Sequence, residues 1–310
     1  MRLVMKAALA GAFCLLAAGV YAQGQPDFSK VEIKVTPLGN NTYMLEGQGG
    51  NVVAAVGQDG VIQVDGEFAP LHDKIKAAID KVSGGKPIKY LINTHFHGDH
   101  TGGNAPFHKD GTTIVAHRNL ALRLEHGSTN GLSGAKTAPA EKDAIPTQTY
   151  TTEGLRLMVE GQTANVNHPA SAHTDTDSYV YFPTSNVVAT GDTVSLGERY
   201  VTIDYANGGS INGIISTVET YIKIGNDQTK YVPGHGPLAS KADLQRYHDM
   251  LVQVRDAVQS QIKAGKTEEQ AIAAKPLAEI GAKLHTNQMA DDNMVKMVYR
   301  SLKGAKANKA

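Results

Sequence analysis

The sequence predicts an α/β fold in which sheet lies at the centre and helices lie outside. The chain opens with several short segments that alternate apolar and polar residues, as half-buried strands do. Beyond residue 70, helical periodicity alternates with short apolar runs, an order that is typical of α/β domains. The 32 glycines among 310 residues also favour a fold rich in turns over a helical bundle.

Composition limits the classes of partner. Hydrophobic residues make up 41% of the chain, which suits one large domain or two small ones. The 30 basic side chains balance 30 acidic ones, so the formal net charge is zero. This balance gives no attraction to nucleic acid or to an anionic membrane, and neither is predicted as a partner.

Residues 1–22 are typical of a signal peptide, which is removed from the mature protein. Arg2 and Lys6 form a short basic region, residues 7–20 are apolar, and a cleavage site precedes Gln23. The apolar stretch is too short to span a membrane comfortably. We therefore expect a periplasmic or secreted protein with no membrane contact after cleavage.

Cys14 is the only cysteine and leaves with the signal peptide. The bulky Phe13 before it disfavours a lipoprotein. The mature protein is thus expected to have no disulfide and no thiolate that could serve as ligand or nucleophile.

Strand patterns fill the first part of the mature chain, and a helix follows them. The alternation and the turn residues predict an antiparallel meander at residues 31–35, 43–45, 51–56 and 61–65. Residues 71–82 place apolar side chains on one helical stripe, and the segment 84–87, Gly-Gly-Lys-Pro, ends that helix.

The same patterns continue to the C-terminal region. We predict strands at residues 88–93, 113–116, 155–159, 178–182 and 187–189, a short strand from Tyr231 into His235, and helices at 119–125, 211–224 and 241–264. Residues 127–147 are polar and aperiodic, which predicts a long loop that could cover a site. Residues 267–303 predict amphipathic helices that pack on the outside.

A histidine-rich motif follows the apolar run at 88–93. It places His95, His97, Asp99 and His100 within six consecutive positions. Alternation along an extended backbone points His95 and His97 to the same side, and Gly98 then lets the chain turn. Imidazoles and a carboxylate without a thiolate are the ligands expected for zinc or another divalent transition metal. The motif therefore predicts part of a metal site.

Three more polar residues lie in the same context, close to the end of an apolar strand. They are His173, Asp192 and His235. Ligands of a catalytic metal commonly come from loops at one edge of a rigid sheet. These positions are candidates to complete the site.

The four motifs 95–100, 172–174, 191–193 and 233–236, in this order, resemble the metallo-β-lactamase superfamily. The resemblance covers residues 31 to about 251. It implies a four-layer αβ/βα sandwich with two metal ions at one edge of the paired sheets. The expected organisation is a signal peptide at 1–22, the metallo-β-lactamase-fold domain at 23–265 and a C-terminal helical extension at 266–310.

Carried over residue by residue, the resemblance assigns a role to each candidate. His95, His97 and His173 would hold the first metal. Asp99, His100 and His235 would hold the second, and Asp192 would bridge the two. Asp99 would also act in catalysis by orienting the nucleophile.

Three other residues have weaker assignments. Asp65 resembles a position that steadies the histidine loop, with a plain turn residue as the alternative. His168 is either a residue behind the ligands or a surface residue. His117 ends a predicted strand and is expected to start the next helix.

The ligand set implies two Zn²⁺ ions, with iron as the other possible metal. Two such ions lower the pKa of a shared water to about 7, and the metal-bound hydroxide then attacks the substrate. We therefore expect a metal-dependent hydrolase that acts on a small-molecule substrate. The sequence makes no prediction of the oligomeric state.

Features that bear on the substrate point in different directions. Export favours hydrolysis of a β-lactam, a cyclic amide, and this is the leading prediction. At position 192, however, this chain has Asp where well-known secreted β-lactamases of this fold have Cys or Ser. At position 195 it has Ser where those enzymes often have Lys. An aspartate resembles thioesterases, lactonases and phosphodiesterases of this fold, which are the alternatives, followed by a mononuclear-iron sulfur dioxygenase.

Three candidate substrate contacts complete the prediction. Arg199 is a candidate for binding a carboxylate, and Tyr200 and Asn207 are candidates for contacts with an oxyanion or with substrate. A plain loop role is the alternative for each.

Overall fold

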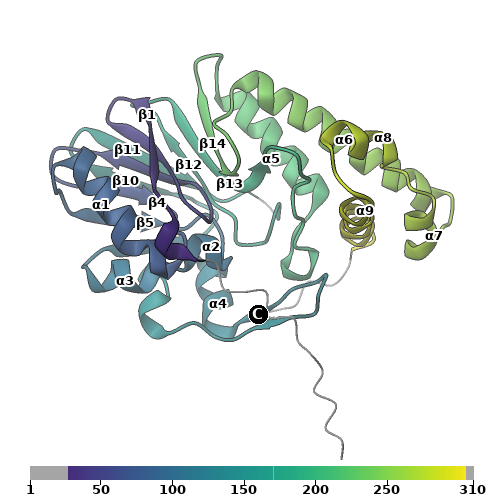
Figure 1. The fold of residues 1–310 in the computed structure, drawn as a ribbon, viewed down its shortest axis with the longest axis horizontal. Coiled ribbons are helices and arrows are strands. Elements are labelled where there is room, and N and C mark those ends of the chain that lie inside the picture. Colours follow the sequence, from purple (N-terminus) through teal and green to yellow (C-terminus); the bar gives the residue numbers. More distant parts are fainter. Residues whose placement is uncertain (1–26, 170, 305–310) are drawn as a thin grey trace, which may run out of the picture.

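Two β-sheets face each other at the centre of the molecule, and helices cover their outer faces (Figure 1). The computed structural model describes residues 27–169 and 171–304, so the predicted signal peptide lies outside the described residues. Among the described residues, no helix is long and apolar enough to cross a membrane.

The first sheet has seven strands in the order β1-β2-β3-β4-β5-β6-β9. Its first four strands are antiparallel, and β4, β5, β6 and β9 run parallel to one another. The strands are β1 (Lys34–Gly39), β2 (Thr42–Glu46), β3 (Val52–Val56), β4 (Val61–Val64), β5 (Ile88–Ile92), β6 (Thr113–His117) and β9 (Gln148–Tyr150).

The second sheet has five strands in the order β10-β11-β12-β13-β14. Only its last pair, β13 and β14, is parallel. The strands are β10 (Leu155–Val159), β11 (Gln162–Asn167), β12 (Tyr179–Phe182), β13 (Val187–Ser195) and β14 (Lys230–His235).

Helices join the parallel strands and cover the sheets. On the first sheet lie α1 (His72–Ser83), the short α2 (Gly98–Thr101), α3 (Asn104–Lys109) and α4 (Arg118–His126). On the second lie α5 (Ile211–Ile224) and α6 (Lys241–Lys263), and Figure 1 shows them on the side opposite to α1 and α3. Burial of one apolar face of each helix stabilises this arrangement.

Three buried clusters separate the layers. Val64 and Ile92 of the first sheet pack against Val180 and Val232 of the second. A second cluster lies between the first sheet and α1, and a third lies between the second sheet and helices α5 and α6. The order helix, sheet, sheet, helix confirms the predicted αβ/βα sandwich.

The C-terminal helices join the third of these clusters. They are α7 (Glu268–Ala273), α8 (Ala278–Leu284) and α9 (Gln288–Leu302). Met294 and Val298 of α9 are buried with Leu251 of α6. The division of the chain at residue 265 stays a prediction.

Some elements differ from those predicted. Strand β1 begins at Lys34 rather than at residue 31, and β11 was not predicted. Strand β11 alternates in burial, but its inward positions include the small Ala164 and its other positions are polar, so its apolar signal is weak. The predicted loop 127–147 contains a hairpin of β7 (Ser128–Thr129) and β8 (Lys136–Thr137) and a 3₁₀ turn, η3 (Lys142–Ala144).

Candidate metal centre

All seven predicted ligands lie together at one edge of the paired sheets. The histidine-rich motif follows the carboxyl end of β5, while Asp192 lies in the last part of β13 and His235 ends β14. Strands β4, β5 and β6 are parallel to one another, as are β13 and β14. Because the carboxyl ends of parallel strands meet at one edge, residues far apart in sequence converge there.

The first group consists of His95, His97, His173 and Asp192, whose ligand atoms lie within 4.8 Å of one another. Nδ1 of His97 lies 3.0 Å from Nε2 of His95 and 3.1 Å from Nε2 of His173. Oδ2 of Asp192 lies 3.9 Å from the His95 nitrogen and 3.8 Å from the His173 nitrogen.

The second group consists of Asp99, His100 and His235. Nε2 of His235 lies 3.2 Å from Oδ2 of Asp99. Asp192 also reaches this group, because its Oδ1 lies 3.2 Å from Nε2 of His100 and its Oδ2 lies 3.5 Å from Nε2 of His235. The Asp192 carboxylate therefore lies between the two groups.

In their neutral forms, two histidines of the first group point unprotonated nitrogens at each other. Nδ1 of His173 lies 2.7 Å from the Thr202 carbonyl oxygen, which can only accept, so Nδ1 carries the proton. Nε2 of His97 donates to the Asp204 carboxylate at 3.1 Å, which leaves Nδ1 of His97 without a proton. The two unprotonated nitrogens face each other at 3.1 Å, an arrangement that a metal ion would stabilise.

Two further atoms support the same conclusion in the second group. Nε2 of His100 and Oδ1 of Asp192 are buried and face each other at 3.2 Å, and neither forms a hydrogen bond of good geometry. Buried polar atoms without partners are costly, and here both belong to predicted ligands. Imidazole nitrogens and carboxylate oxygens are the donors that zinc prefers when no thiolate is present. The residues at this edge therefore fit a site for divalent metal ions.

Residues behind the ligands fix their orientation, which raises the basicity of metal-binding imidazoles. Asp65 accepts from Nδ1 of His100 at 2.8 Å and from both the backbone N–H and the hydroxyl of Thr94 at 2.7 Å. It is buried and has φ +61°, so its backbone adopts the left-handed conformation that few non-glycine residues adopt. This geometry agrees with the predicted role of Asp65 in steadying the histidine loop.

Charged groups of the ligand cluster shift one another's pKa values. Burial raises the pKa of the Asp192 carboxyl, but the imidazoles of His100 and His95 outweigh burial and hold that pKa well below its usual range. Hydrogen bonds to Asp192 and Asp99 raise the pKa of His235 to about 9. Asp192 therefore stays ionised among the ligand nitrogens, where a carboxylate can attract a cation.

Two glycines leave space for the ligands. A Cβ atom on Gly50 would overlap the imidazole of His100, and a Cβ atom on Gly234 would overlap the Asp192 carboxylate. Gly50 lies in the loop between β2 and β3 of the first sheet, and Gly234 lies in β14 of the second sheet. Any larger residue at either position would displace a predicted ligand.

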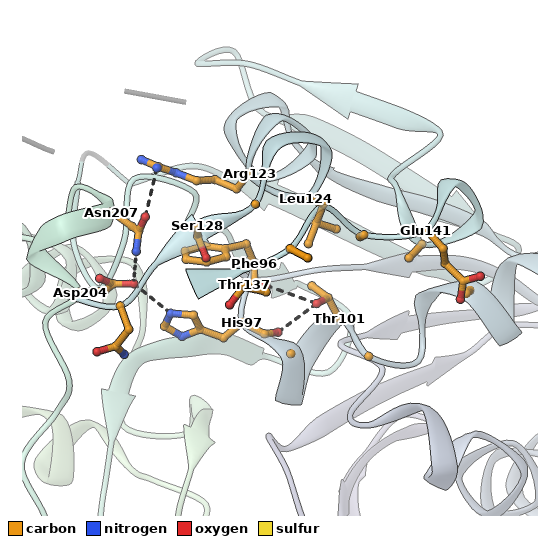
Figure 2. Close-up of a pocket in the computed structure, with 18 residues that line it drawn as sticks. Phe96, His97, Thr101, Arg123, Leu124, Ser128, Thr137, Glu141, Asp204 and Asn207 are labelled. Atoms are coloured by element: carbon orange, nitrogen blue, oxygen red, sulfur yellow. Dashed lines mark hydrogen bonds and ion pairs between the residues drawn. The ribbon is translucent and has the colours of Figure 1, made fainter. Parts of the chain in front are cut away.

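A pocket of about 300 Å³ opens beside the first group. Figure 2 shows His97 on one side of it, with Phe96 and Thr101 next to it and Arg123 and Asn207 across from it. Segment 127–144, which includes the β7–β8 hairpin, forms the opposite wall. Of the three predicted substrate contacts, Asn207 lines this pocket.

The other two predicted contacts lie elsewhere. Tyr200 is buried and donates a hydrogen bond to Asp291 of α9 at 3.0 Å. Arg199 is exposed and lines a separate hollow with Tyr247 and Met250. Their roles in substrate binding stay predictions.

Two residues at the site were not predicted from the sequence. Asp204 orients His97, and the buried Glu67 accepts from the backbone N–H groups of Gln48 and Gly49 in the turn beside Asp99. Asp204 lies in an irregular stretch with no strand end or periodic pattern beside it. A carboxylate three residues before the predicted contact Asn207 was the only signal that could have found it.

Comparisons with known proteins identify the family and the fold. The family model of the metallo-beta-lactamase superfamily matches residues 35–235. The alpha subunit of 2,4-dinitroanisole O-demethylase from Nocardioides sp. is 30% identical over 185 residues, which are 59% of this chain and 51% of that protein. This chain thus spans about half the length of that relative.

Solved structures show the same fold. A metallo-beta-lactamase from Pontibacter korlensis is 18% identical, with a TM-score of 0.58 over 71% of this chain and 99% of that one. A stereoselective inverting sec-alkylsulfatase from Pseudomonas sp. is 14% identical, with a TM-score of 0.66 over 88% of this chain and 50% of that one. At these identities the likeness concerns the fold alone. The family model, however, covers well over half of the chain, and the chain belongs to the metallo-β-lactamase superfamily.

Proposed function

We propose that this metal-dependent hydrolase is an exported enzyme that uses two zinc ions. The observation that carries the proposal is the position of Asp192, whose two oxygens face the two groups of ligand atoms. A carboxylate shared in this way is suited to bridging two cations. The absence of a thiolate is consistent with zinc held by nitrogen and oxygen donors.

Two zinc ions bound here would lower the pKa of a shared water towards 7 and polarise the reacting oxygen of the substrate. The side chains around the ions would orient the ligand imidazoles and accept the proton of the nucleophile. Asp204 keeps His97 in the tautomer that leaves Nδ1 free to bind, and Asp65 does the same for Nε2 of His100. Asp99 has 30% of its side chain exposed, against 13% for Asp192. Asp99 is therefore the carboxylate that can reach a nucleophile and accept its proton.

For the substrate, β-lactam hydrolysis remains the first candidate, and it is supported by the proposed export of the enzyme. The aspartate at position 192 supports the alternatives, which are thioesters, lactones and phosphoesters. The relatives' names add a secondary alkyl sulfate and 2,4-dinitroanisole to the compounds to be tested.

One experiment separates these possibilities. Protein purified without added metal is analysed for zinc and iron, and the zinc-loaded enzyme is then offered a chromogenic cephalosporin, a lactone, a thioester, a phosphodiester, an alkyl sulfate and 2,4-dinitroanisole. We expect two equivalents of zinc and hydrolysis of at least one compound. One equivalent of iron with oxygen consumption on a persulfide would overturn the hydrolase. No cephalosporin turnover by the zinc-loaded enzyme would remove the β-lactam candidate.

Export has its own test. We expect the protein in the periplasmic fraction or the medium, with a mature N-terminus at Gln23. N-terminal sequencing of the fractionated protein checks both points, and an unprocessed chain in the cytoplasm would contradict the proposed export.

A further inference from the structure

The pocket beside His97 is separate from the metal ligands in most of its lining, so its chemistry can be considered by itself. His97 and its partner Asp204 form one end (Figure 2). A molecule in the pocket would therefore lie against the first group of ligands. This position makes the pocket a candidate for binding the part of the substrate that does not react.

Apolar side chains supply much of the pocket lining. They come from the histidine motif, from α3 and α4, and from segment 138–144, and they are Phe96, Ala105, Leu124, Ala138, Ala140 and Ala144. Most are small, which is what leaves the space open. A cavity of this kind favours an apolar occupant because binding removes apolar surface from water.

The charged groups of the pocket interior already face other protein groups. Arg123 is buried and forms an ion pair with Asp175 at 2.7 Å and a hydrogen bond with Asn207 Oδ1 at 3.1 Å. Asp204 accepts from His97 at 3.1 Å and from Asn207 Nδ2 at 2.7 Å. A carboxylate or ammonium buried beside these groups would lose hydration without a dedicated counter-charge, because Glu141, the remaining acidic lining residue, is exposed. The lining therefore favours an uncharged group.

The size of the pocket narrows the choice further. Its volume of about 300 Å³ is roughly twice that of an engineered apolar cavity, about 150 Å³, that takes up benzene. A single methyl or ethyl group would leave most of it unfilled. An aromatic group of one or two rings matches it.

The hairpin wall is held in place by the 3₁₀ turn η4 (Tyr205–Asn207). Asn207 donates to the Thr129 carbonyl at 3.1 Å, and the Tyr205 hydroxyl donates to the Gly131 carbonyl. Arg300 of α9 in turn donates to the Tyr205 oxygen at 2.5 Å and pairs with Glu268. The wall opposite His97 is thus fixed to η4 and, through Tyr205, to α9, which gives the pocket a defined shape.

From these observations we propose that the pocket binds an uncharged aromatic group of the substrate, with segment 138–144 as the determinant of its size. The proposal rests on the proposed hydrolase function, because it assigns the pocket to the same substrate. It makes the enzyme selective for aromatic over small aliphatic esters or amides.

The experiment fills the pocket and measures binding apart from catalysis. Ala140→Phe and Ala138→Phe add a ring within the lining, while Ala135→Phe is the matched control on the same hairpin, exposed and outside the lining. Binding of 2-naphthol to the zinc-loaded protein is measured by calorimetry, and binding of 2-naphthoate is the charged comparison. Thermal unfolding shows whether each variant is folded.

We expect 2-naphthol to bind the unchanged protein at least about tenfold more tightly than 2-naphthoate, since burying an unpaired carboxylate is costly. Both filling variants should weaken 2-naphthol binding by about tenfold or more, and Ala135→Phe should change it less than about twofold. Equal binding in the filling and control variants, or tighter binding of 2-naphthoate, would overturn the proposal. These outcomes do not depend on turnover, so an enzyme that binds 2-naphthol but hydrolyses no ester would instead contradict the proposed function.

A second readout and a further variant, Leu124→Ala, keep the proposal testable if one filling variant fails to fold. For a folded filling variant, kcat/KM for a 2-naphthyl ester relative to the methyl ester of the same acid should fall by about tenfold. Leu124→Ala, which enlarges the pocket, should raise that ratio. A ratio that is unchanged in Leu124→Ala and in both filling variants would contradict the assignment of the pocket.

Discussion

The two halves of the molecule contribute to the metal centre in different ways. The first half supplies four predicted ligands from six consecutive residues, 95–100. The second half supplies three, His173, Asp192 and His235, from three separate segments. The ligands of the first half are neighbours in sequence, whereas those of the second half become neighbours only when the second sheet folds. Yet each group of ligand atoms contains residues from both halves, so neither half can form a complete site by itself.

This difference shows what holds the site together. Asn51 of the first half donates its backbone N–H to the Gly234 carbonyl at 2.8 Å and its side-chain amide to the Pro233 and Gly236 carbonyls at 2.8 and 2.9 Å. Ser178 of the second half donates its backbone N–H to the Thr94 carbonyl at 2.6 Å. The packing of one sheet on the other is therefore part of the metal site.

Asp192→Ala gives the largest expected effect, because this residue of the second half faces both groups. Zinc content should fall from two equivalents to less than one. Hydrolysis should fall on the order of 10³-fold, since metal ions supply several kcal/mol of transition-state stabilisation. Metal analysis and steady-state kinetics check this prediction. A variant that keeps two equivalents of zinc would exclude a bridging role.

His95→Ala and His235→Ala compare one ligand from each half. Each belongs to one group only, so each variant should lose about one equivalent of zinc and most of the activity. The zinc retained by His95→Ala should be in the second group, and that retained by His235→Ala in the first. Spectroscopy of the cobalt-substituted variants can distinguish the two environments. If His95→Ala kept full activity, the assignment of the motif would be wrong.

Asp65→Asn and Asp204→Asn compare the supporting carboxylates of the two halves. Each removes the charge behind one imidazole, His100 or His97, and should weaken metal binding by about 10- to 100-fold. Asp65→Asn should have the larger effect, because Asp65 also accepts two hydrogen bonds from Thr94. Competition with a zinc chelator gives the affinities. Equal affinity in both variants and the unchanged protein would mean that these contacts do not orient the ligands.

His117→Asn tests an interaction between the halves away from the metals. His117 stacks on His168 at 3.7 Å, and burial together with His168 lowers the pKa of His117 to about 4. Between the ordinary value of 6.5 and about 4, the unfolded chain binds a proton that the folded chain does not. Stability should therefore fall as pH drops through this range.

The His117→Asn variant should lose less stability over this range. Asn still serves as an N-cap for α4, as His117 does by accepting from the Asn119 N–H. The measurement is chemical unfolding at several pH values, with the exposed His126→Asn as the control. An unchanged pH slope in His117→Asn would contradict the lowered pKa.

Much of the fold and most of the site could be predicted from the sequence. The fold prediction is confirmed, because strand alternation and helix stripes report burial directly. The ligands come together because β5, β13 and β14 carry six of them to one sheet edge, and the loop between β11 and β12, which carries His173, reaches the same edge. Their binding of two metal ions stays a prediction.

The parts that were missed depend on contacts that leave no local pattern. Asp204 acts on His97 from more than 100 residues away in the chain, in a stretch without regular structure. Tyr200 contacts α9, and nothing near it in the sequence indicates that helix. The pocket wall is a hairpin of two-residue strands, which are too short for periodicity to detect.

The contact between Asn51 and the segment around Gly234 has a consequence for the conditions under which the enzyme can work. These hydrogen bonds connect an uncharged amide to backbone carbonyl groups. Dissolved ions therefore do not weaken them as they weaken an exposed ion pair. The pocket wall differs, because it is supported partly by the Arg300–Glu268 pair at the surface side of α9. Rising salt should therefore affect the choice of substrate before it affects the retention of metal.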